Sequence, residues 1–382
     1  MSEQGLTARI WISTMISRAK IGGAAVKRMT SFVGGPDAIF DASDKRLREA
    51  VGGPPETIES FNRFLDGGRS RDAAIHAAEQ LQAINAYAVW YLDEGYPERL
   101  LHIPSPPPVL FYRTALDTHL SLLDTPSVAV IGTRQPTPYG EEAAKRISRD
   151  LTKRGILVVS GLARGIDTCA HAAALEAGGS TVAVLASGID IIYPEENRGL
   201  AERIMSHGVL LSEQPPGTPP KANLFPARNR IISGLCDATA VIEAASRSGT
   251  MITAGCALDQ GRDVFAVPGS IFNERSDGTN QLLKEGAYVL TDAEDILERL
   301  PSNLRMLKML GDVESCTPDC EKIVDFASGV LSLLVGEFLD ANAISERLGL
   351  GIRETVMLLL ELELSGEVRK EKGRYRLGRG VL

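Results

Sequence analysis

Residues 156–167 of the chain read Ile-Leu-Val-Val-Ser-Gly-Leu-Ala-Arg-Gly-Ile-Asp, an apolar run followed by a glycine-rich turn. A similar unit precedes it, in which Val128–Ile131 leads into Gly132-Thr133-Arg134. Short, fully apolar runs that alternate with helical segments are typical of parallel strands buried on both faces. These two units therefore predict an α/β protein built on a parallel sheet.

The same pattern extends to residue 267. Apolar runs predict the strands, and the segments between most of them have helical spacing. The predicted strands are Val128–Ile131, Ile156–Ser160, Thr181–Leu185, Val209–Leu211, Ala238–Ile242 and Val264–Val267, and the predicted helices include Tyr139–Arg154, Thr168–Ala177 and Thr250–Gln260. Because loops after the C-terminal ends of parallel strands form the crevice of such a sheet, we expect the binding site there.

A proline cluster from Pro104 to Pro108 precedes another short apolar run, Val109–Tyr112. Proline favours extended chain and cannot donate a hydrogen bond to a neighbouring strand. We therefore predict that this run is an edge strand.

Composition divides the chain into four segments. Residues 1–85 predict short helices broken by glycine pairs, residues 86–300 hold the sheet, and residues 301–322 predict a linker. Residues 323–382 have the spacing of a helix-turn-helix followed by a charged hairpin, as in a winged-helix domain. Its predicted parts are the helix Ala343–Leu348, the turn Gly349-Leu350-Gly351, the helix Ile352–Ser365 and the wing Val368–Leu377.

In the first segment, Ile21-Gly22-Gly23-Ala24 precedes an apolar helix, which is similar to a helix-hairpin-helix. A small helical packing module and a DNA-binding hairpin are both open interpretations, and the sequence favours the first. The overall prediction is an α/β core, a small N-terminal helical domain of SAM or helix-hairpin-helix type, and a C-terminal winged-helix domain.

Charge and composition limit the class of protein. The 382 residues are 44% hydrophobic, and 41 basic against 49 acidic residues give a net charge of −8. This charge excludes a polycation that coats nucleic acid, although it allows a local basic patch. The N-terminus lacks signal-peptide features and no apolar stretch reaches about 20 residues, so we expect a cytoplasmic protein without a membrane partner.

The common catalytic and cofactor motifs are absent from the sequence. Gly132 stands alone after the first strand, so no dinucleotide fingerprint is present, and no Gly-Lys pair can form a P-loop. No metalloprotease or serine-hydrolase motif occurs, and the five scattered cysteines suggest free thiols. We expect no catalytic residue, cofactor or metal.

Three loops contain residues suited to anions. Glycine allows a phosphate to approach the backbone, helix N-terminal amides point toward it, and arginine binds it with a fork of donors. Asp167 is expected to cap a helix from Thr168 or, alternatively, to transfer protons, and Glu243 is either an acid/base or a loop-orienting residue. The candidate residues are Gly132 and Arg134 in the first loop, Ser160, Gly161, Arg164 and Gly165 in the second, and Arg247, Gly249 and Thr250 in the third.

Residues 221–230 read Lys-Ala-Asn-Leu-Phe-Pro-Ala-Arg-Asn-Arg, with three cations and no acid. Cations that follow phosphates and a ring that stacks on an unpaired base are what single-stranded nucleic acid requires. We interpret this stretch as a binding loop whose cations contribute little to folding. The alternative is that the arginines pair with carboxylates and the ring fills the core. The candidate residues are Lys221, Phe225, Arg228, Asn229 and Arg230.

Together these motifs resemble the DprA/Smf family of bacterial DNA-processing proteins over roughly residues 96–290. Two small departures are Thr250-Met251, where Ser-Leu is more usual, and Asn223-Leu224. The matching motifs occur in one order: Gly132-Thr133-Arg134, residues 160–167, Gly188-Ile189-Asp190, Tyr193-Pro194, residues 225–235, Ser248-Gly249-Thr250, residues 261–269, Gly278-Thr279-Asn280 and Gly286-Ala287.

The resemblance implies an extended Rossmann-like core that binds single-stranded DNA with little sequence preference. It also implies a homodimer through the core domain that protects incoming DNA and loads the RecA recombinase during natural transformation. The residues that it implies as DNA contacts are Arg134, Lys221, Phe225, Arg228, Asn229 and Arg247.

Two other classes of protein are weighed against this one. A phosphoribohydrolase-like enzyme would need an acidic residue just inside the helix that begins near Thr250, and residues 250–255 contain none. A sequence-specific repressor would read DNA through Ile352–Ser365, but that segment has one cation and three acids. We therefore expect the tail to bind protein, or to touch phosphate only through its basic wing.

Overall fold

The structure is a computed structural model that describes residues 3–67, 70–117, 119–300, 330–334, 338–349 and, in the tail, 351, 355–356, 358–359, 362–363, 368–371 and 374–377. The chain forms two compact units, Met1–Asp312 and Val313–Leu382, and each is described by itself. The predicted linker at 301–322 lies outside the described residues.

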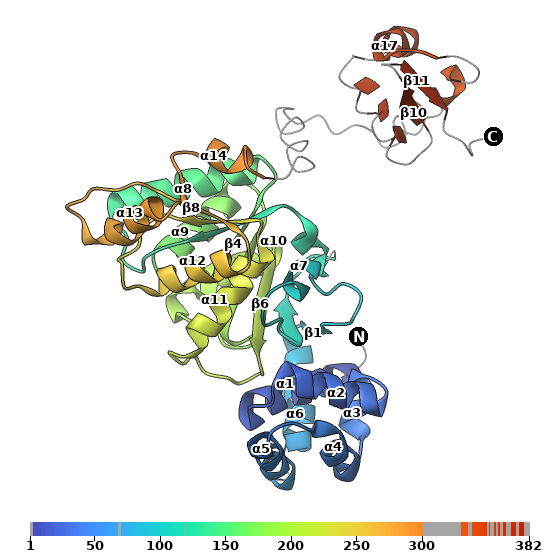
Figure 1. The fold of residues 1–382 in the computed structure, drawn as a ribbon, viewed down its shortest axis with the longest axis vertical. Coiled ribbons are helices and arrows are strands. Elements are labelled where there is room, and N and C mark those ends of the chain that lie inside the picture. The colour runs from blue at the N-terminus through green and yellow to red at the C-terminus, as the bar shows by residue number, and fades with distance from the viewer. Residues whose placement is uncertain are drawn as a thin grey trace. The chain divides into compact units, whose positions relative to one another are not determined.

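Within the described residues, the first unit contains a nine-stranded sheet with the order β1-β2-β6-β5-β4-β3-β7-β8-β9. Figure 1 shows this sheet among the helices of the unit. Strands β3 to β9 pair in parallel, whereas β1 and β2 join the β6 side in antiparallel pairs. The strands are β1 (Ala86–Trp90), β2 (Val109–Arg113), β3 (Ser127–Ile131), β4 (Leu157–Ser160), β5 (Thr181–Gly188), β6 (Val209–Gln214), β7 (Ala238–Val241), β8 (Asp263–Ala266) and β9 (Tyr288–Val289).

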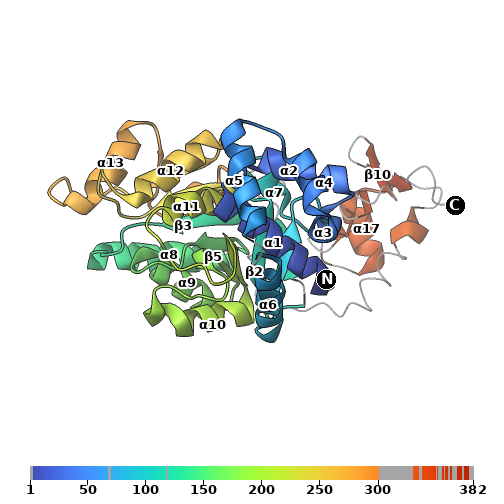
Figure 2. The same ribbon diagram turned by 90° about the horizontal axis from the view of Figure 1, so that it is seen from below.

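Helices cover both faces of the sheet, as Figure 2 shows, with α11 and α12 on one side and α8, α9 and α10 on the other. The helices of this region are α7 (Glu98–Leu101), α8 (Pro138–Lys153), α9 (Ile166–Glu176), α10 (Arg198–His207), α11 (Leu224–Leu235), α12 (Gly249–Asp259), α13 (Asp277–Lys284) and α14 (Ala293–Leu297). Short 3-10 turns are η1 (His119–Asp124), η2 (Glu195–Asn197) and η3 (Glu274–Ser276).

The alternating side chains of β3 explain this three-layer arrangement. Val128 and Val130 pack with residues of α8 and α9, whereas Ala129 and Ile131 pack with residues of α11 and α12. A strand buried on both faces must be apolar at every position, and this requirement produces the unbroken apolar runs of the sequence. The predicted parallel sheet with helices on both faces is confirmed.

The position of β3 creates a crevice. From β3 the chain adds β4, β5 and β6 on one side, and later β7, β8 and β9 on the other. The connections that leave β3 and its neighbour β7 therefore pass to opposite faces of the sheet. Loops that diverge at such a switch point leave an open crevice at the C-terminal ends of the strands.

The N-terminal segment contains six helices in the described residues, and they pack around Trp11 and Met15, both fully buried on the first helix. The same apolar cluster continues into Ala86, Trp90 and Phe111 of the sheet, so the division at residue 85 stays a prediction. The helices are α1 (Glu3–Ala19), α2 (Gly23–Val33), α3 (Pro36–Asp41), α4 (Asp44–Val51), α5 (Pro55–Asp66) and α6 (Ser70–Ala83).

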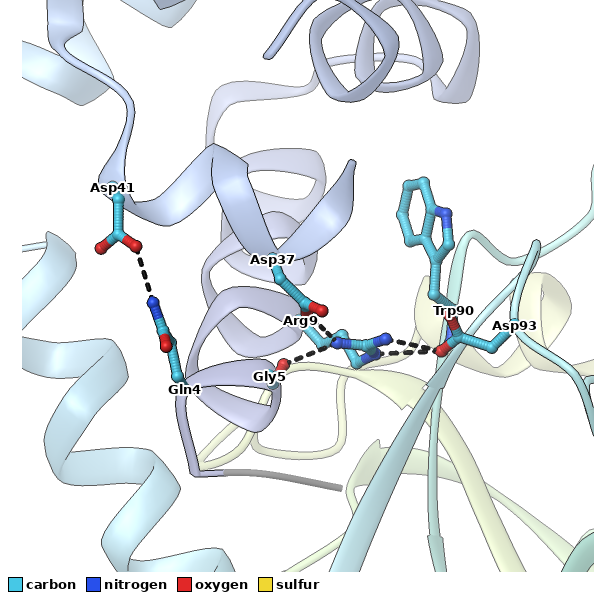
Figure 3. Close-up of polar contacts among 7 residues, drawn as sticks. All are labelled: Gln4, Gly5, Arg9, Asp37, Asp41, Trp90 and Asp93. Carbon is cyan, nitrogen blue, oxygen red and sulfur yellow. Dashed lines mark hydrogen bonds and ion pairs between the residues drawn. The ribbon is translucent and has the colours of Figure 1, made fainter. Parts of the chain in front are cut away.

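A buried arginine also joins these helices to the sheet (Figure 3). Arg9 on α1 donates through Nη2 to Asp93 Oδ2 at 2.7 Å and through Nη1 to Asp37 Oδ1 at 2.6 Å and to the carbonyl of Gly5 at 2.9 Å. The same Asp93 oxygen accepts the backbone N–H of Trp90 at 2.8 Å. Arg9 therefore ties α1 to α3 and to the turn that follows β1.

Three details of the sequence interpretation are wrong. Val109–Arg113 is not an edge strand, because β1, which the sequence interpretation missed, pairs along its outer side, and its prolines precede the strand. Residues 224–230 of the predicted binding loop belong to helix α11 and not to a loop. Pro226 lies in the first turn of that helix, where a missing N–H costs little. The short strand β9 was also missed.

In the second unit, the described residues include α17 (Ala341–Leu348) and an antiparallel hairpin of β10 (Val368–Glu371) and β11 (Arg374–Leu377). Gly349 ends α17 with φ of 67°, as the predicted turn requires. Leu339 pairs with Tyr375 of the hairpin, and Ile344, Leu359 and Val368 share one core. Most of the predicted helix Ile352–Ser365 lies outside the described residues.

Candidate functional site

A cleft of about 850 Å³ opens at the switch point. Its walls come from the loop after β3, the loop after β4, the first two turns of α11 and the start of α12. Eight of the predicted site residues line it: Gly132, Arg134, Arg164, Phe225, Arg228, Asn229, Gly249 and Thr250. The fold therefore brings together most of the loops that the sequence singled out.

Phe225 lies at the centre of an aromatic and cationic group in this cleft. The guanidinium carbon of Arg134 is 4.9 Å from the ring centroid and that of Arg228 is 5.9 Å from it. The ring of Tyr193 meets Phe225 edge-on at 6.0 Å between centroids. Tyr193 is half-exposed, and the sequence indicates it only through the family resemblance and not as a site residue.

Arg228 is buried, with 6% of its surface exposed, and its guanidinium is held by backbone carbonyls. Nη1 donates to the carbonyl of Gly161 at 2.6 Å and to that of Val184, and Nε donates to Asn229 Oδ1 at 3.2 Å. Burial lowers the pKa of Arg228 to about 10, which keeps it charged at neutral pH. A side chain at Gly161 would overlap this guanidinium, which explains the glycine.

Asp167 holds the loop after β4 and does not cap the helix. Helix α9 begins at Ile166, so Asp167 lies inside the first turn, and the expectation of a cap before Thr168 is wrong. Its Oδ2 accepts the backbone N–H groups of Gly161 at 3.1 Å and Ala163 at 3.3 Å. Burial raises the pKa of Asp167, and the charge of Arg228 opposes that shift.

The loops after β3 and β4 meet at two glycines. Ile166 donates its backbone N–H to the carbonyl of Thr133 at 3.2 Å. Gly165 has φ of 78°, and a Cβ there would collide with the same carbonyl. A Cβ on Gly132 would lie 2.6 Å from Cγ1 of Ile166. Only glycine permits this approach of the two loops.

The third wall is the first turn of α12, which begins at Gly249. Asn229 Nδ2 donates to the carbonyl of Gly249 at 3.3 Å and so links α11 to α12. Thr250 is 9% exposed, and Ser248 Oγ has no hydrogen-bond partner among the described residues. Free amides at a helix start favour a negatively charged group.

Glu243, two residues after β7, orients a loop. Its carboxylate accepts the backbone N–H of Thr137 at 2.9 Å and the Thr137 hydroxyl at 2.5 Å. Thr133 donates its N–H to the Glu243 carbonyl at 2.8 Å. With 1% of its surface exposed, Glu243 fixes the loop between β3 and α8.

The remaining predicted residues lie outside the cleft lining. Ser160 is buried and donates to the carbonyl of Val130 at 2.7 Å. Arg230 points away from the cleft and pairs with Glu213. Lys221 and Arg247 are exposed and, like Arg134, form no ion pair with any residue that the structure describes.

Arg164 is an exposed cation of the cleft that already has a partner. It forms two hydrogen bonds to Glu196, of 2.6 and 2.9 Å.

Among the described residues, no three His, Cys, Asp or Glu side chains gather as metal ligands would. In the same part of the chain, no helix combines the length and apolar character that crossing a bilayer requires.

Fold and site together define a Rossmann-like α/β protein with an aromatic and cationic cleft at the switch point of its sheet. The chain belongs to the DNA recombination-mediator protein A family, whose family model matches residues 87–301. Residues 327–374 match the DprA winged helix domain, which confirms the winged-helix prediction. The resemblance to the DprA/Smf family is confirmed as well.

Relatives and solved structures agree with this assignment. The chain is 40% identical to protein Smf of Escherichia coli over 84% of each chain, and 43% identical to the DNA processing protein DprA of Streptococcus pneumoniae over 58% of this chain and 76% of that protein.

The crystal structure of the Streptococcus pneumoniae protein superposes with a TM-score of 0.65 at 32% identity, over 79% of this chain and 99% of that one. A Helicobacter pylori structure, which concerns the single-stranded DNA binding mode of DNA processing protein A, gives a TM-score of 0.51 at 30% identity, over 60% and 98%.

Proposed function

We propose that this chain binds single-stranded DNA in the cleft around Phe225 and acts in DNA processing during recombination. The observation that carries the proposal is the Phe225 ring in the cleft with the guanidinium carbons of Arg134 and Arg228 at 4.9 and 5.9 Å from its centroid. A ring stacks on any base, and nearby cations attract phosphates, so binding of this kind needs no particular sequence. The single-stranded DNA binding of the Helicobacter pylori relative supports the same reading.

The site residues divide into two roles under this proposal. Arg134, Lys221 and Arg247 are exposed and contact phosphates, together with the free amides at Gly249 and Thr250. The walls of the cleft are held by Arg228, Asn229 and the glycines of the loops after β3 and β4. The buried Arg228 also adds positive charge to the cleft. Arg164 is already paired with Glu196, which offsets part of the positive charge that it offers to a phosphate.

The wider role follows the family. We propose that the protein protects incoming DNA, passes it to the RecA recombinase during natural transformation, works in the cytoplasm and forms a homodimer through the core domain. Half-exposed apolar side chains on the core, among them Ile252, Leu258 and Val289, offer surface for a protein partner. The segments 1–85, 86–300, 301–322 and 323–382 remain our proposed domains and linker.

We also propose that the cleft binds without catalysing a reaction. The phosphoribohydrolase-like alternative depends on a free carboxylate near α12, and the Glu243 carboxylate is occupied by Thr137. Prolonged incubation of stoichiometric protein with a nucleotide mixture tests this point. Free adenine that disappears with Glu243→Gln would replace our proposal with the enzyme.

The direct test is a titration with single- and double-stranded oligonucleotides of one sequence. We expect tighter binding of the single strand at a definite stoichiometry. If three to five phosphates are neutralised, log K falls with log salt at a slope of about −2 to −3.5. Equal affinity for duplex and single strand would overturn the proposal.

A further inference from the structure

A second groove, of about 680 Å³, lies on the other side of helix α11 from the cleft. Leu224, Ala227 and Arg230 of α11 line this groove, whereas Phe225, Arg228 and Asn229 line the cleft. Its opposite wall is the hairpin between α1 and α2, with Gly22, Gly23, Ala24 and Lys27. The first turn of α11 therefore separates the cleft from the second groove.

The hairpin wall is basic within an acidic protein. Residues 4–36 contain five cations and no carboxylate, although the chain has a net charge of −8. Two of these cations already have partners within the fold. Arg9 pairs with Asp93, and Arg28 donates to the carbonyl of Val51 at 2.7 Å. The other three, Arg18, Lys20 and Lys27, are exposed and form no ion pair with a described residue.

The groove itself contains unsatisfied donors. Its only lining carboxylate within the described residues, Glu213, pairs with Arg230. Arg230 Nη1 and the Tyr91 hydroxyl are buried and have no hydrogen-bond partner among the described residues. Leaving buried polar groups unpaired costs free energy, and a phosphodiester in the groove would offer acceptor oxygens to these donors when their side chains turn toward it.

Packing fixes the hairpin relative to the core. Ile21 is buried at the turn, and an added methyl group on Gly23 would lie 3.6 Å from Pro108 Cγ. Ser13 Oγ of α1 donates to the carbonyl of Glu213 in β6 at 3.3 Å. The exposed backbone of Gly22-Gly23 is thus presented to the groove by a rigid support.

We propose that a DNA strand bound in the cleft continues past the start of α11 into this second groove, where Lys27 and Lys20 hold its sugar–phosphate backbone. The inference rests on the proposed function of the cleft. It gives a role in DNA binding to the hairpin Ile21-Gly22-Gly23-Ala24, whose sequence also fitted a plain packing module. Lys221, exposed three residues before α11, would contact the strand where it crosses the start of this helix.

The test uses the full chain and two single-stranded oligonucleotides, one of about 6 nucleotides that fills the cleft and one of about 20 that reaches further. The variant is Lys20→Gln with Lys27→Gln, and the matched control is Lys45→Gln with Lys153→Gln, which removes the same charge from exposed positions elsewhere. Fluorescence anisotropy gives each affinity over a range of salt concentrations.

We expect the Lys20/Lys27 variant to bind the long oligonucleotide about tenfold more weakly, and its salt slope to fall in magnitude by about 1.4. Its affinity for the short oligonucleotide should stay within about twofold of that of the control. If the variant and the control bind the long strand equally while Phe225→Ala weakens both strands, the second groove is overturned and the cleft stands. If the unaltered protein binds neither strand, the cleft and the groove both fail.

Discussion

The guanidinium carbon of Arg134 lies 4.9 Å from the centroid of the Phe225 ring, in contact across the switch point of the sheet. Arg134 follows β3, and Phe225 belongs to the first turn of α11, so the pair joins two walls of the cleft. A cation over an aromatic ring contributes about 0.5–2 kcal/mol, depending on how far it is desolvated. A base that stacks on Phe225 would meet a ring already held in place.

The first prediction concerns this ring. Phe225→Ala should weaken single-stranded DNA binding by about 1–3 kcal/mol, because base stacking is lost, whereas Phe225→Trp should bind nearly as well as the unaltered protein. Anisotropy titrations at one fixed salt concentration measure both. A Phe225→Leu variant that binds like the unaltered protein would show that the ring acts only as apolar filling.

The second prediction separates Arg228 from Arg134. Arg228→Ala should lower the free energy of unfolding by about 2–4 kcal/mol, because it leaves the carbonyls of Gly161 and Val184 without their donor and removes the positive charge that favours the ionised form of the buried Asp167. Arg134→Ala should lower the free energy of unfolding by no more than about 1 kcal/mol, because its side chain is exposed and its contact with the Phe225 ring is weak there, so its main effect is on binding. Urea denaturation followed by circular dichroism measures both variants.

The burial of Arg228 argues against the expectation that the cations of residues 221–230 contribute little to folding, whereas the exposed Lys221 agrees with it. An Arg228 variant as stable as the Arg134 variant would restore that expectation. The expectation treated Arg228 and Arg230 alike because it assumed a loop. On helix α11, residues two apart lie about 200° apart around the axis, so Arg228 faces the cleft and Arg230 faces the second groove. A sequence interpretation that lacked helix α11 could not assign different roles to these two arginines.

Other parts of the site could be predicted from the sequence because they depend on residues that are close together in the chain. Gly132 and Gly165 mark the meeting of two loops, and the strands β3 and β4 that precede these loops are buried along their whole length and mostly apolar. The burial of Asp167 against Arg228 was not readable, since it depends on contacts between β4, α9 and α11. Strand β1 was missed because its pairing with β2 is a tertiary contact, which the proline cluster before β2 does not indicate.

The third prediction concerns the close approach of the two loops. Gly165→Ala should cost about 1–3 kcal/mol of stability and weaken DNA binding, because φ of 78° is strained for alanine and its methyl group would strike the carbonyl of Thr133. Gly261→Ala is the matched control, with φ of 68° and open space around the added carbon. It should cost about 1–2 kcal/mol and leave DNA binding unchanged. Unchanged DNA binding in Gly165→Ala would contradict the role of this loop.

The fourth prediction tests how α1 is fastened to the sheet. Arg9→Met should lower the free energy of unfolding by about 2–3 kcal/mol, because the 2.7 Å pair with Asp93 is lost from a buried site. Asp37→Asn should cost less than about 1 kcal/mol, since the Asp37 side chain is 64% exposed. Equal losses in the two variants, measured by chemical denaturation, would show that burial of Arg9 does not set the strength of this link.

The fifth prediction concerns His171, which is fully buried on α9. Its Nδ1 lies 2.7 Å from the hydroxyl oxygen of Thr181, and that hydroxyl donates its own proton to the carbonyl of Val158. Nδ1 must therefore carry the ring proton and donate to Thr181. Burial, with the charge of Arg228 adding to it, lowers the pKa of His171 to about 3.

This lowered pKa makes stability depend on pH with a definite sign. Below pH of about 6.5 the unfolded chain protonates this histidine, whereas the folded chain keeps it neutral until about pH 3. The unfolded state then binds more protons, so the folded state loses about 2 kcal/mol between pH 6.5 and pH 5 from this group. His171→Gln should be less stable at pH 7 but have a flatter curve in that window. The raised pKa of Asp167 acts in the opposite direction and is shared by both proteins, so the difference between their urea midpoints isolates His171. Parallel curves for the two proteins would mean that His171 is protonated or exposed in the folded state.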